Sequence, residues 1–75
     1  MRQGVLTIYD LNPDGVRVVV NWDSMVIGAS IFIPCVNTEK ATNQVKKVMA
    51  LKGWECRYQV RIESDKLGLR VWRTI

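Results

Sequence analysis

The residues best suited to chemistry lie in the last third of the chain, where arginines recur beside a tryptophan. The cationic side chains are Arg57, Arg61 and Arg70, with Gln59 between the first two and Trp72 after the third. A guanidinium group binds phosphate oxygens and base edges, and a tryptophan ring can stack on a base. These residue types therefore predict a surface that binds nucleic acid and not a reaction centre.

Alternation of polar and apolar residues between Trp54 and Arg73 predicts the element that positions these side chains. Period-two alternation on both sides of Ser64 and Asp65 is typical of two antiparallel strands joined by a turn. With the turn centred there, positions 57 and 72, 59 and 70, and 61 and 68 pair on a polar face. Positions 58 and 71, 60 and 69, and 62 and 67 pair on an apolar face, which we expect to be buried beneath a helix.

Charge is unevenly distributed along the chain. Residues 1–39 carry a net charge of −2 and residues 40–75 one of +6, within a total of +4. This asymmetry favours an anionic partner, to which Lys46, Lys47 and Arg73 would add non-specific attraction. A solvated face that only keeps a small protein in solution would carry the same charges, so both interpretations stay open.

Catalytic and metal-binding chemistry is poorly supported by the composition. The chain has no histidine, so the commonest general base and a usual zinc ligand are missing. Cys35 and Cys56 lie in apolar, strand-like stretches and are interpreted as buried free thiols. The carboxylates fall mainly in turns, caps and strand ends, and no glycine-rich loop could hold a phosphate. We therefore predict a non-enzymatic protein without catalytic residues, cofactor or metal site.

The first half of the chain predicts a hairpin followed by a third strand. Residues 5–11 and 16–22 are rich in β-branched and aromatic side chains and flank the turn sequence Asn12-Pro13-Asp14-Gly15. Residues 26–35 carry apolar side chains on both faces, which is typical of a central strand. Residue 12 is predicted opposite 16, and 10 opposite 18. The hairpin residues predicted to be buried are Leu6, Ile8, Val16, Val18, Val20 and Trp22.

One helix is predicted between a cap at Asn37 or Thr38 and a stop at Gly53. Its apolar stripe consists of Ala41, Val45, Val48 and Met49. With no second helix available, this stripe must pack on a sheet. The chain is thus predicted to be a single α+β domain, residues 1–75, with the order β-β-β-α-β-β. Its one antiparallel-rich sheet would carry the amphipathic helix on one face.

Cellular location is predicted only by default. No run of apolar residues is long enough to span a membrane, and the first residues lead into an alternating segment and not into a signal-peptide core. We therefore expect a cytoplasmic protein with no membrane partner.

Residues 29–73 contain two short motifs on either side of the predicted helix. The first is Ser30-Ile31-Phe32-Ile33-Pro34, and the second is Gly68-Leu69-Arg70-Val71-Trp72-Arg73. This stretch resembles short open reading frames of unknown function in tailed bacteriophages, which tend to share a Ser-aromatic-Phe-aliphatic-Pro strand, one helix and a Gly-x-Arg-Val-Trp-Arg ending. Ile31 stands where an aromatic residue is often found. The resemblance implies a phage origin and the host cytoplasm. It carries no activity, although small phage proteins of this kind commonly bind nucleic acid or block a host protein.

Two functions therefore remain open from the sequence. The first is nucleic-acid binding through the polar face of residues 54–73. The second is a protein-interaction module, either an inhibitor of a host protein or a self-assembling accessory factor that forms a homo-oligomer. The second would use Trp72, Tyr9 or a sheet edge, because tryptophan, tyrosine and arginine dominate interfaces and open edges accept strands.

Overall fold

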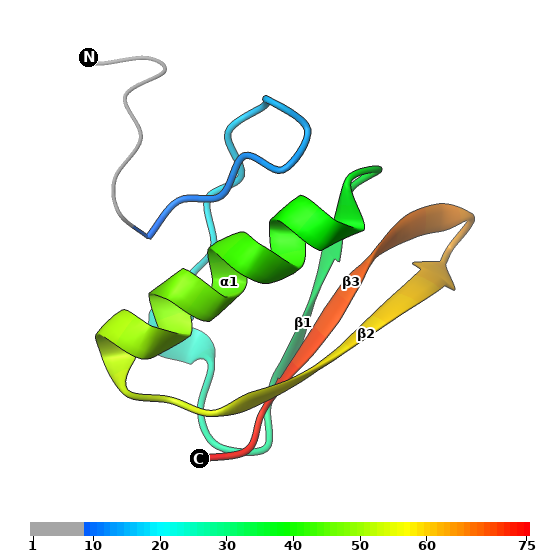
Figure 1. Ribbon diagram of the computed structural model, residues 1–75. Coiled ribbons are helices and arrows are strands. Elements are labelled where there is room, and N and C mark those ends of the chain that lie inside the picture. The colour runs from blue at the N-terminus through cyan, green and yellow to red at the C-terminus, as the bar shows by residue number, and fades with distance from the viewer. Residues whose placement is uncertain (1–8) are drawn as a thin grey trace.

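The computed structural model describes residues 9–75, which form one helix packed on one face of an antiparallel sheet (Figure 1). This arrangement confirms the predicted α+β class. Within this part of the chain, no helix is long and apolar enough to cross a membrane. In chain order the elements are the short 3-10 helix η1 (Trp22–Ser24), β1 (Ser30–Pro34), α1 (Thr38–Lys52), β2 (Cys56–Glu63) and β3 (Lys66–Arg73).

The ribbon of β2 and β3 has the predicted register. Arg57 lies opposite Trp72, and the pairing continues without a gap to the end of both strands. The two connecting residues, Ser64 and Asp65, have φ angles of 50° and 64°. Positive φ at both central positions is the turn geometry that matches the twist of two paired strands. Local sequence was therefore enough to predict this hairpin.

Strand β3 lies at the centre of the sheet, whose order is β1-β3-β2. Leu69 of β3 is only 1% exposed because strands flank it on both sides and α1 covers it. Val60, which lies opposite Leu69 on the edge strand β2, is 54% exposed, and Ile62 is 73% exposed. The prediction that the whole apolar face of the ribbon is buried is therefore wrong at these two positions, because an edge strand has a neighbour on one side only. It is also wrong at Leu67 of β3, which lies beside the turn and is 39% exposed.

Helix α1 begins and ends where the sequence predicts. The side chain of Asn37 accepts a hydrogen bond from the backbone N–H of Lys40 at 3.0 Å, which caps the first turn. Gly53, with φ of 71°, donates its N–H to Met49 O and ends the helix in the left-handed conformation. Its buried residues are those of the predicted stripe: Ala41, Val45, Val48 and Met49.

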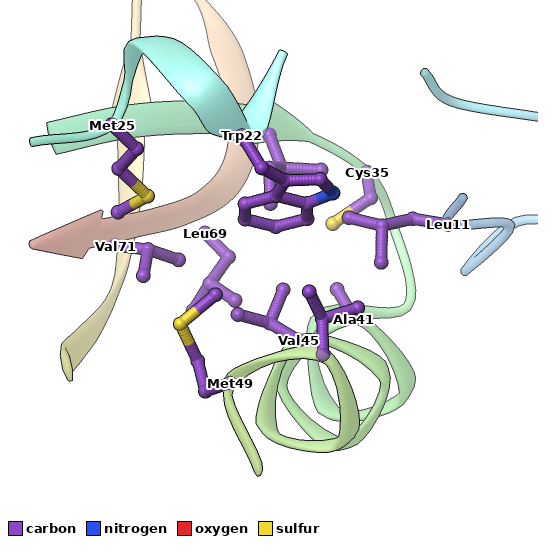
Figure 2. Close-up of a cluster of buried hydrophobic side chains, with 11 residues drawn as sticks. Leu11, Trp22, Met25, Cys35, Ala41, Val45, Met49, Leu69 and Val71 are labelled. Atoms are coloured by element: carbon purple, nitrogen blue, oxygen red, sulfur yellow. The ribbon is translucent and has the colours of Figure 1, made fainter. Parts of the chain in front are cut away.

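The core lies between α1, the sheet and the segment that precedes β1. Figure 2 shows Trp22 and Leu11 on one side of the cluster and the helix residues Ala41 and Val45 on the other. The indole N–H of Trp22 donates to Tyr9 O at 2.8 Å, so the buried ring leaves no polar atom unpaired. Burial of each such side chain contributes about 1.5–3 kcal/mol to folding. The segment before β1 therefore completes the core.

The predicted N-terminal hairpin is largely wrong in the described residues. Residues 5–8, including Leu6 and Ile8, lie outside them. Of the remaining pairs, one antiparallel bridge joins Leu11 to Val18, where residue 10 was expected opposite 18. Leu11 is consequently fully buried and Val16 is 70% exposed. Trp22 is buried as predicted, and Val18 and Val20 pack partly against the core.

Contacts with the helix explain why this segment does not extend the sheet. Asn12 exchanges two hydrogen bonds with the side chain of Gln44, at 2.8 and 2.7 Å. The carboxylate of Asp14 accepts from the N–H groups of Asn37 at 2.8 Å and of Val36 at 2.9 Å. These polar groups hold the turn against α1 and against the loop between β1 and α1. Strand propensity is overridden here by tertiary hydrogen bonds.

The third predicted strand, 26–35, is shortened to Ser30–Pro34. Gly28 has a φ of 87°, and Ala29 N bonds to Val26 O at 2.9 Å, so residues 26–29 form a turn. Val26 and Ile27 are exposed as a result, at 62% and 64%. The glycine, which was treated as a strand residue, is the point at which the chain turns into β1.

Replacing Asp14 with alanine is expected to destabilise the fold in a pH-dependent way. The hydrogen bonds from Asn37 and then Val36 hold the pKa of the Asp14 carboxyl below its ordinary value. A lowered folded-state pKa means that the stabilisation is present above the unfolded-state pKa, near 4, and is lost as the pH falls through the folded-state value. Urea denaturation of the wild type and of Asp14→Ala should therefore differ most near neutral pH and converge in acid. A difference that does not depend on pH would contradict this role.

Candidate functional site

The candidate site is the face of the sheet opposite α1, here called the open face. Successive side chains of a strand point to opposite sides, so the residues that alternate with the buried ones gather here. In Figure 1, α1 lies against one side of the sheet, and no described element covers the other side. The open face consists of Ser30, Phe32, Pro34, Arg57, Gln59, Arg61, Glu63, Lys66, Gly68, Arg70 and Trp72.

The open face brings together five of the eight predicted site residues, from two strands: Arg57, Gln59, Arg61, Arg70 and Trp72. The open face carries four cationic side chains and one carboxylate, that of Glu63. The cations are Arg57, Arg61, Lys66 and Arg70. The face is therefore basic, as the charge distribution along the chain predicts. The structure also adds Phe32 from β1, which sequence analysis did not include because the pairing of β1 with β3 was not predicted.

Arg70 is committed to contacts within the protein. Its guanidinium forms a two-point ion pair with Glu63, with one of the two contacts at 3.1 Å, and donates to Ser30 Oγ at 3.1 Å. It also lies over the ring of Phe32, 5.5 Å from the centroid. The hydrogen bonds from Arg70 hold the pKa of the Glu63 carboxyl below its ordinary value. Arg70 therefore links all three strands and is poorly placed to release its side chain to a ligand.

The arginine over the tryptophan ring is Arg61, not the expected Arg57. Arg61 lies 6.0 Å from the ring centroid of Trp72 and 3.4 Å from the carboxylate of Glu63. Arg61 lies four residues along β2 from Arg57, the residue opposite Trp72, and on the same face of the sheet, so the contact depends on the length of the two side chains. With 46% of its side chain exposed, Arg61 remains accessible at one end.

Arg57 and Gln59 are two uncommitted polar residues of the open face. Both are exposed, and neither side chain forms an ion pair or hydrogen bond to another described residue. They line an open pocket of about 550 Å³ together with Tyr58, Trp72, Arg73 and Thr74, and part of its wall is formed by Ile27 and Gly28. That wall was missed because residues 26–29 were predicted to continue a strand. A lone glycine in such a run was the signal that could have found it.

Of the remaining predicted site residues, Lys46 and Lys47 lie on the helix side of the sheet, whereas Arg73, at the end of β3, also lines the pocket. Arg73 packs over the ring of Trp54, 3.7 Å from the centroid, and donates to Met25 O at 2.9 Å and Ile75 O at 3.0 Å. Arg73 therefore has a structural role, because it joins Ile75 to Met25, the residue that follows η1. Lys46 and Lys47 are exposed on α1, where Lys46 lies 5.7 Å from the ring of Tyr58. Neither lysine shares a surface with the pocket.

The thiols and carboxylates do not assemble into a second site. Cys35 is buried and Cys56 half-buried, and burial raises the pKa of both thiols. Among residues 9–75, no group of three or more histidine, cysteine, aspartate or glutamate side chains could hold a metal ion. Comparison with known protein families, curated proteins and solved structures gives no significant match.

Proposed function

We propose that this chain is a small, non-enzymatic, phage-type protein that binds single-stranded nucleic acid through the open face. The observation that carries the proposal is the pocket in which Arg57 and Gln59, both unpaired among the described residues, adjoin Trp72. In this one pocket, the Arg57 cation can bind a phosphate and the Gln59 amide can hydrogen-bond to the edge of a base. The indole ring of Trp72 can stack on the plane of that base.

The pocket has a size suited to such a ligand. Its volume of about 550 Å³ lies within the range of roughly 300–1,000 Å³ that is typical of small-molecule sites. Trp72 supplies a stacking surface, since an aromatic ring can stack on any base. The Gln59 amide offers one acceptor and two donors to the hydrogen-bonding edge of that base.

Electrostatics support the same ligand. Arg57 can bind a phosphate without first breaking an ion pair within residues 9–75. Arg61 and Arg70 both form ion pairs with Glu63, so two cations share one negative charge on the open face. The electrostatic potential of this face therefore stays positive. Arg70 then acts as a scaffold and Arg57 as the contact residue.

A single strand fits this face better than a duplex. Stacking on Trp72 requires a base that is not already stacked between its neighbours, which single strands and loops provide. A duplex groove would instead receive a protruding helix or ribbon, whereas β2 and β3 are here paired into a three-stranded sheet. We therefore expect unpaired DNA or RNA to bind more tightly than the corresponding duplex.

The direct test is a titration of fluorescently labelled single-stranded oligonucleotide, read by anisotropy at two salt concentrations. Binding at micromolar protein is expected in the lower salt. The logarithm of the affinity should fall with the logarithm of the salt concentration by about 0.7 per phosphate neutralised. No binding in the lower salt, or equal affinity for a duplex, would contradict the proposal.

Arg57→Ala is expected to weaken this binding roughly tenfold, because a charge-assisted hydrogen bond contributes about 1.5–3 kcal/mol. Lys47→Ala is the matched control, since it removes the same charge from an exposed position on α1, across the sheet from the pocket. We expect the control to weaken binding less than threefold. Equal losses in the two variants would show that only net charge matters.

The alternative, a protein-interaction module that binds a host or phage protein, predicts a different result. Such a partner would remain on tagged protein after nuclease treatment and would be lost from the Trp72→Ala variant. Retention of this kind, together with no binding in the oligonucleotide titration, would favour the alternative over our proposal.

A further inference from the structure

Strand β2 forms an edge of the sheet with which no described segment pairs. It has eight residues and no proline, and its register against β3 has no interruption. An edge strand exposes a row of unpaired N–H and C=O groups, and proteins usually protect such edges with proline, a bulge or a covering segment. Within residues 9–75 β2 has none of these, so it is suited to pairing with another strand.

The hydrogen bonds of β3 identify the residues of β2 whose backbone groups point outward. Leu67 O and both backbone groups of Arg73 bond toward β1, to Cys35 N, Gly28 N and Ala29 O. Because residues alternate sides along an antiparallel strand, the even-numbered residues of β3 bond to the odd-numbered residues of β2. The residues of β2 that present N–H and C=O groups to the free edge are therefore Cys56, Tyr58, Val60 and Ile62.

The side chains of these residues form an apolar surface beside the same edge. They lie on the helix side of the sheet, where Val60 is 54% and Ile62 73% exposed. Leu67, opposite Ile62 on β3, adds a side chain that is 39% exposed. A strand added to this edge would bury apolar surface as well as satisfying backbone groups.

A second copy of β2 has the chemistry to fill this position. Two copies can pair antiparallel only with outward-pointing residues opposite one another. With Val60 opposite Val60 of the second copy, Tyr58 lies opposite Ile62, so apolar side chains meet on the helix side. On the open face, the same register places Arg57 opposite Glu63 at both ends of the interface, which pairs opposite charges.

The neighbouring registers lack this complementarity. If the two copies of β2 are centred on Gln59, Arg57 lies opposite Arg61 of the second copy. If they are centred on Arg61, that residue lies opposite Arg61 of the second copy. Like charges directly opposite one another destabilise a strand pair. Centring the pair on Ile62 leaves Val60 opposite a turn residue, and centring it on Tyr58 limits the overlap within β2 to residues 56–60. The sequence of β2 therefore selects the register centred on Val60.

We propose that two copies of the chain associate through β2, in antiparallel register about Val60, to form a two-fold symmetric dimer. The two three-stranded sheets become one continuous sheet, with both helices on one side and both open faces on the other. The proposal does not depend on nucleic-acid binding, because it concerns the edge of the sheet and is tested without a nucleic acid.

Val60→Pro tests the dimer directly. In a single copy the Val60 N–H faces solvent, so proline is compatible with the edge strand. In the dimer it removes both hydrogen bonds across the symmetry axis. In sedimentation equilibrium from micromolar to millimolar protein we expect the wild type to dimerise, and the variant to have a dissociation constant raised roughly thirtyfold. Val60→Thr keeps the N–H and should change it less than about threefold.

A charge variant provides a second measurement that leaves the β2 backbone unchanged. Arg57→Glu would place a carboxylate opposite Glu63 of the second copy and should weaken the dimer roughly tenfold. Lys47→Glu makes the same charge change away from the edge and serves as its control. A wild type that stays monomeric throughout, or Val60→Pro and Arg57→Glu variants that dimerise as tightly as the wild type, would overturn the proposal.

Oxidative cross-linking tests the register. Residues opposite each other in a hydrogen-bonded pair have Cα atoms about 5.5 Å apart, a separation that a disulfide can span. Val60→Cys should therefore form a disulfide between the two copies under mild oxidation, identified by peptide mapping, whereas Ile62→Cys should form little. Faster linkage through position 62 would overturn the register centred on Val60.

Discussion

Leu69→Ala is expected to lower the free energy of unfolding by about 3 kcal/mol, the middle of the range for buried leucine truncation. Leu69 is 1% exposed at the centre of β3, flanked by Ile33 and Val60 and covered by α1. A domain of this size rarely has more than about 3–5 kcal/mol of stability from its core alone. Much of the variant should therefore be unfolded at room temperature, as measured by circular dichroism in a urea titration.

Leu67→Ala is the matched control for this prediction. It removes the same atoms from the same face of β3, two residues away, but from a side chain that is 39% exposed. The loss of apolar burial is smaller and no closed cavity remains, so we expect a cost below about 1.5 kcal/mol. Equal costs at the two positions would contradict the description of β3 as buried at its centre and open toward the turn.

Gly68→Ala is the second substitution expected to have a large effect, about 3 kcal/mol, at the upper end of the usual cost of overpacking. A Cβ at this position would overlap Ile33 O and would lie 2.9 Å from the Cα of Pro34 and 2.6 Å from Phe32 Cζ. The phenyl ring can rotate, but the backbone of β1 cannot yield without breaking its pairing with β3. Urea denaturation should show a markedly lower midpoint.

Gly53→Ala separates this steric effect from the general cost of replacing glycine. Gly53 has a φ of 71°, and nothing lies within 4 Å of a Cβ placed there. The substitution therefore costs only the strain of a left-handed residue, about 1–2 kcal/mol. If Gly68→Ala costs no more than this control, β1 and β3 are not as close as the structure has them.

The parts of the fold that were predicted correctly depend on residues close in sequence. The hairpin of residues 56–73 follows from strict alternation around Ser64 and Asp65, and the helix follows from its cap at Asn37 and its stop at Gly53. In each case the backbone geometry is set by side chains within a few positions. Such patterns keep their meaning in any tertiary context.

The parts that were predicted incorrectly depend on distant segments. Residues 10–18 have strand-like composition, yet Asn12 and Asp14 are held by Gln44 and by the N–H groups of residues 36 and 37. Val60 has the same local pattern as Leu69, yet it lies at an edge because β1 pairs with β3 and not with β2. Strand order cannot be inferred from the pattern of a single strand, because alternation is the same at the centre and at the edge.

For the candidate site, the sequence by itself determined which residues of β2 and β3 share the open face, since alternation and the turn fix the side of the sheet on which each side chain lies. Only the tertiary structure decided their roles. It commits Arg70 to Glu63 and Ser30, and leaves Arg57 without a partner among the described residues. It also joins Trp72 to the turn at Gly28 in one pocket. These outcomes depend on contacts between residues far apart in the chain, which only folding brings together.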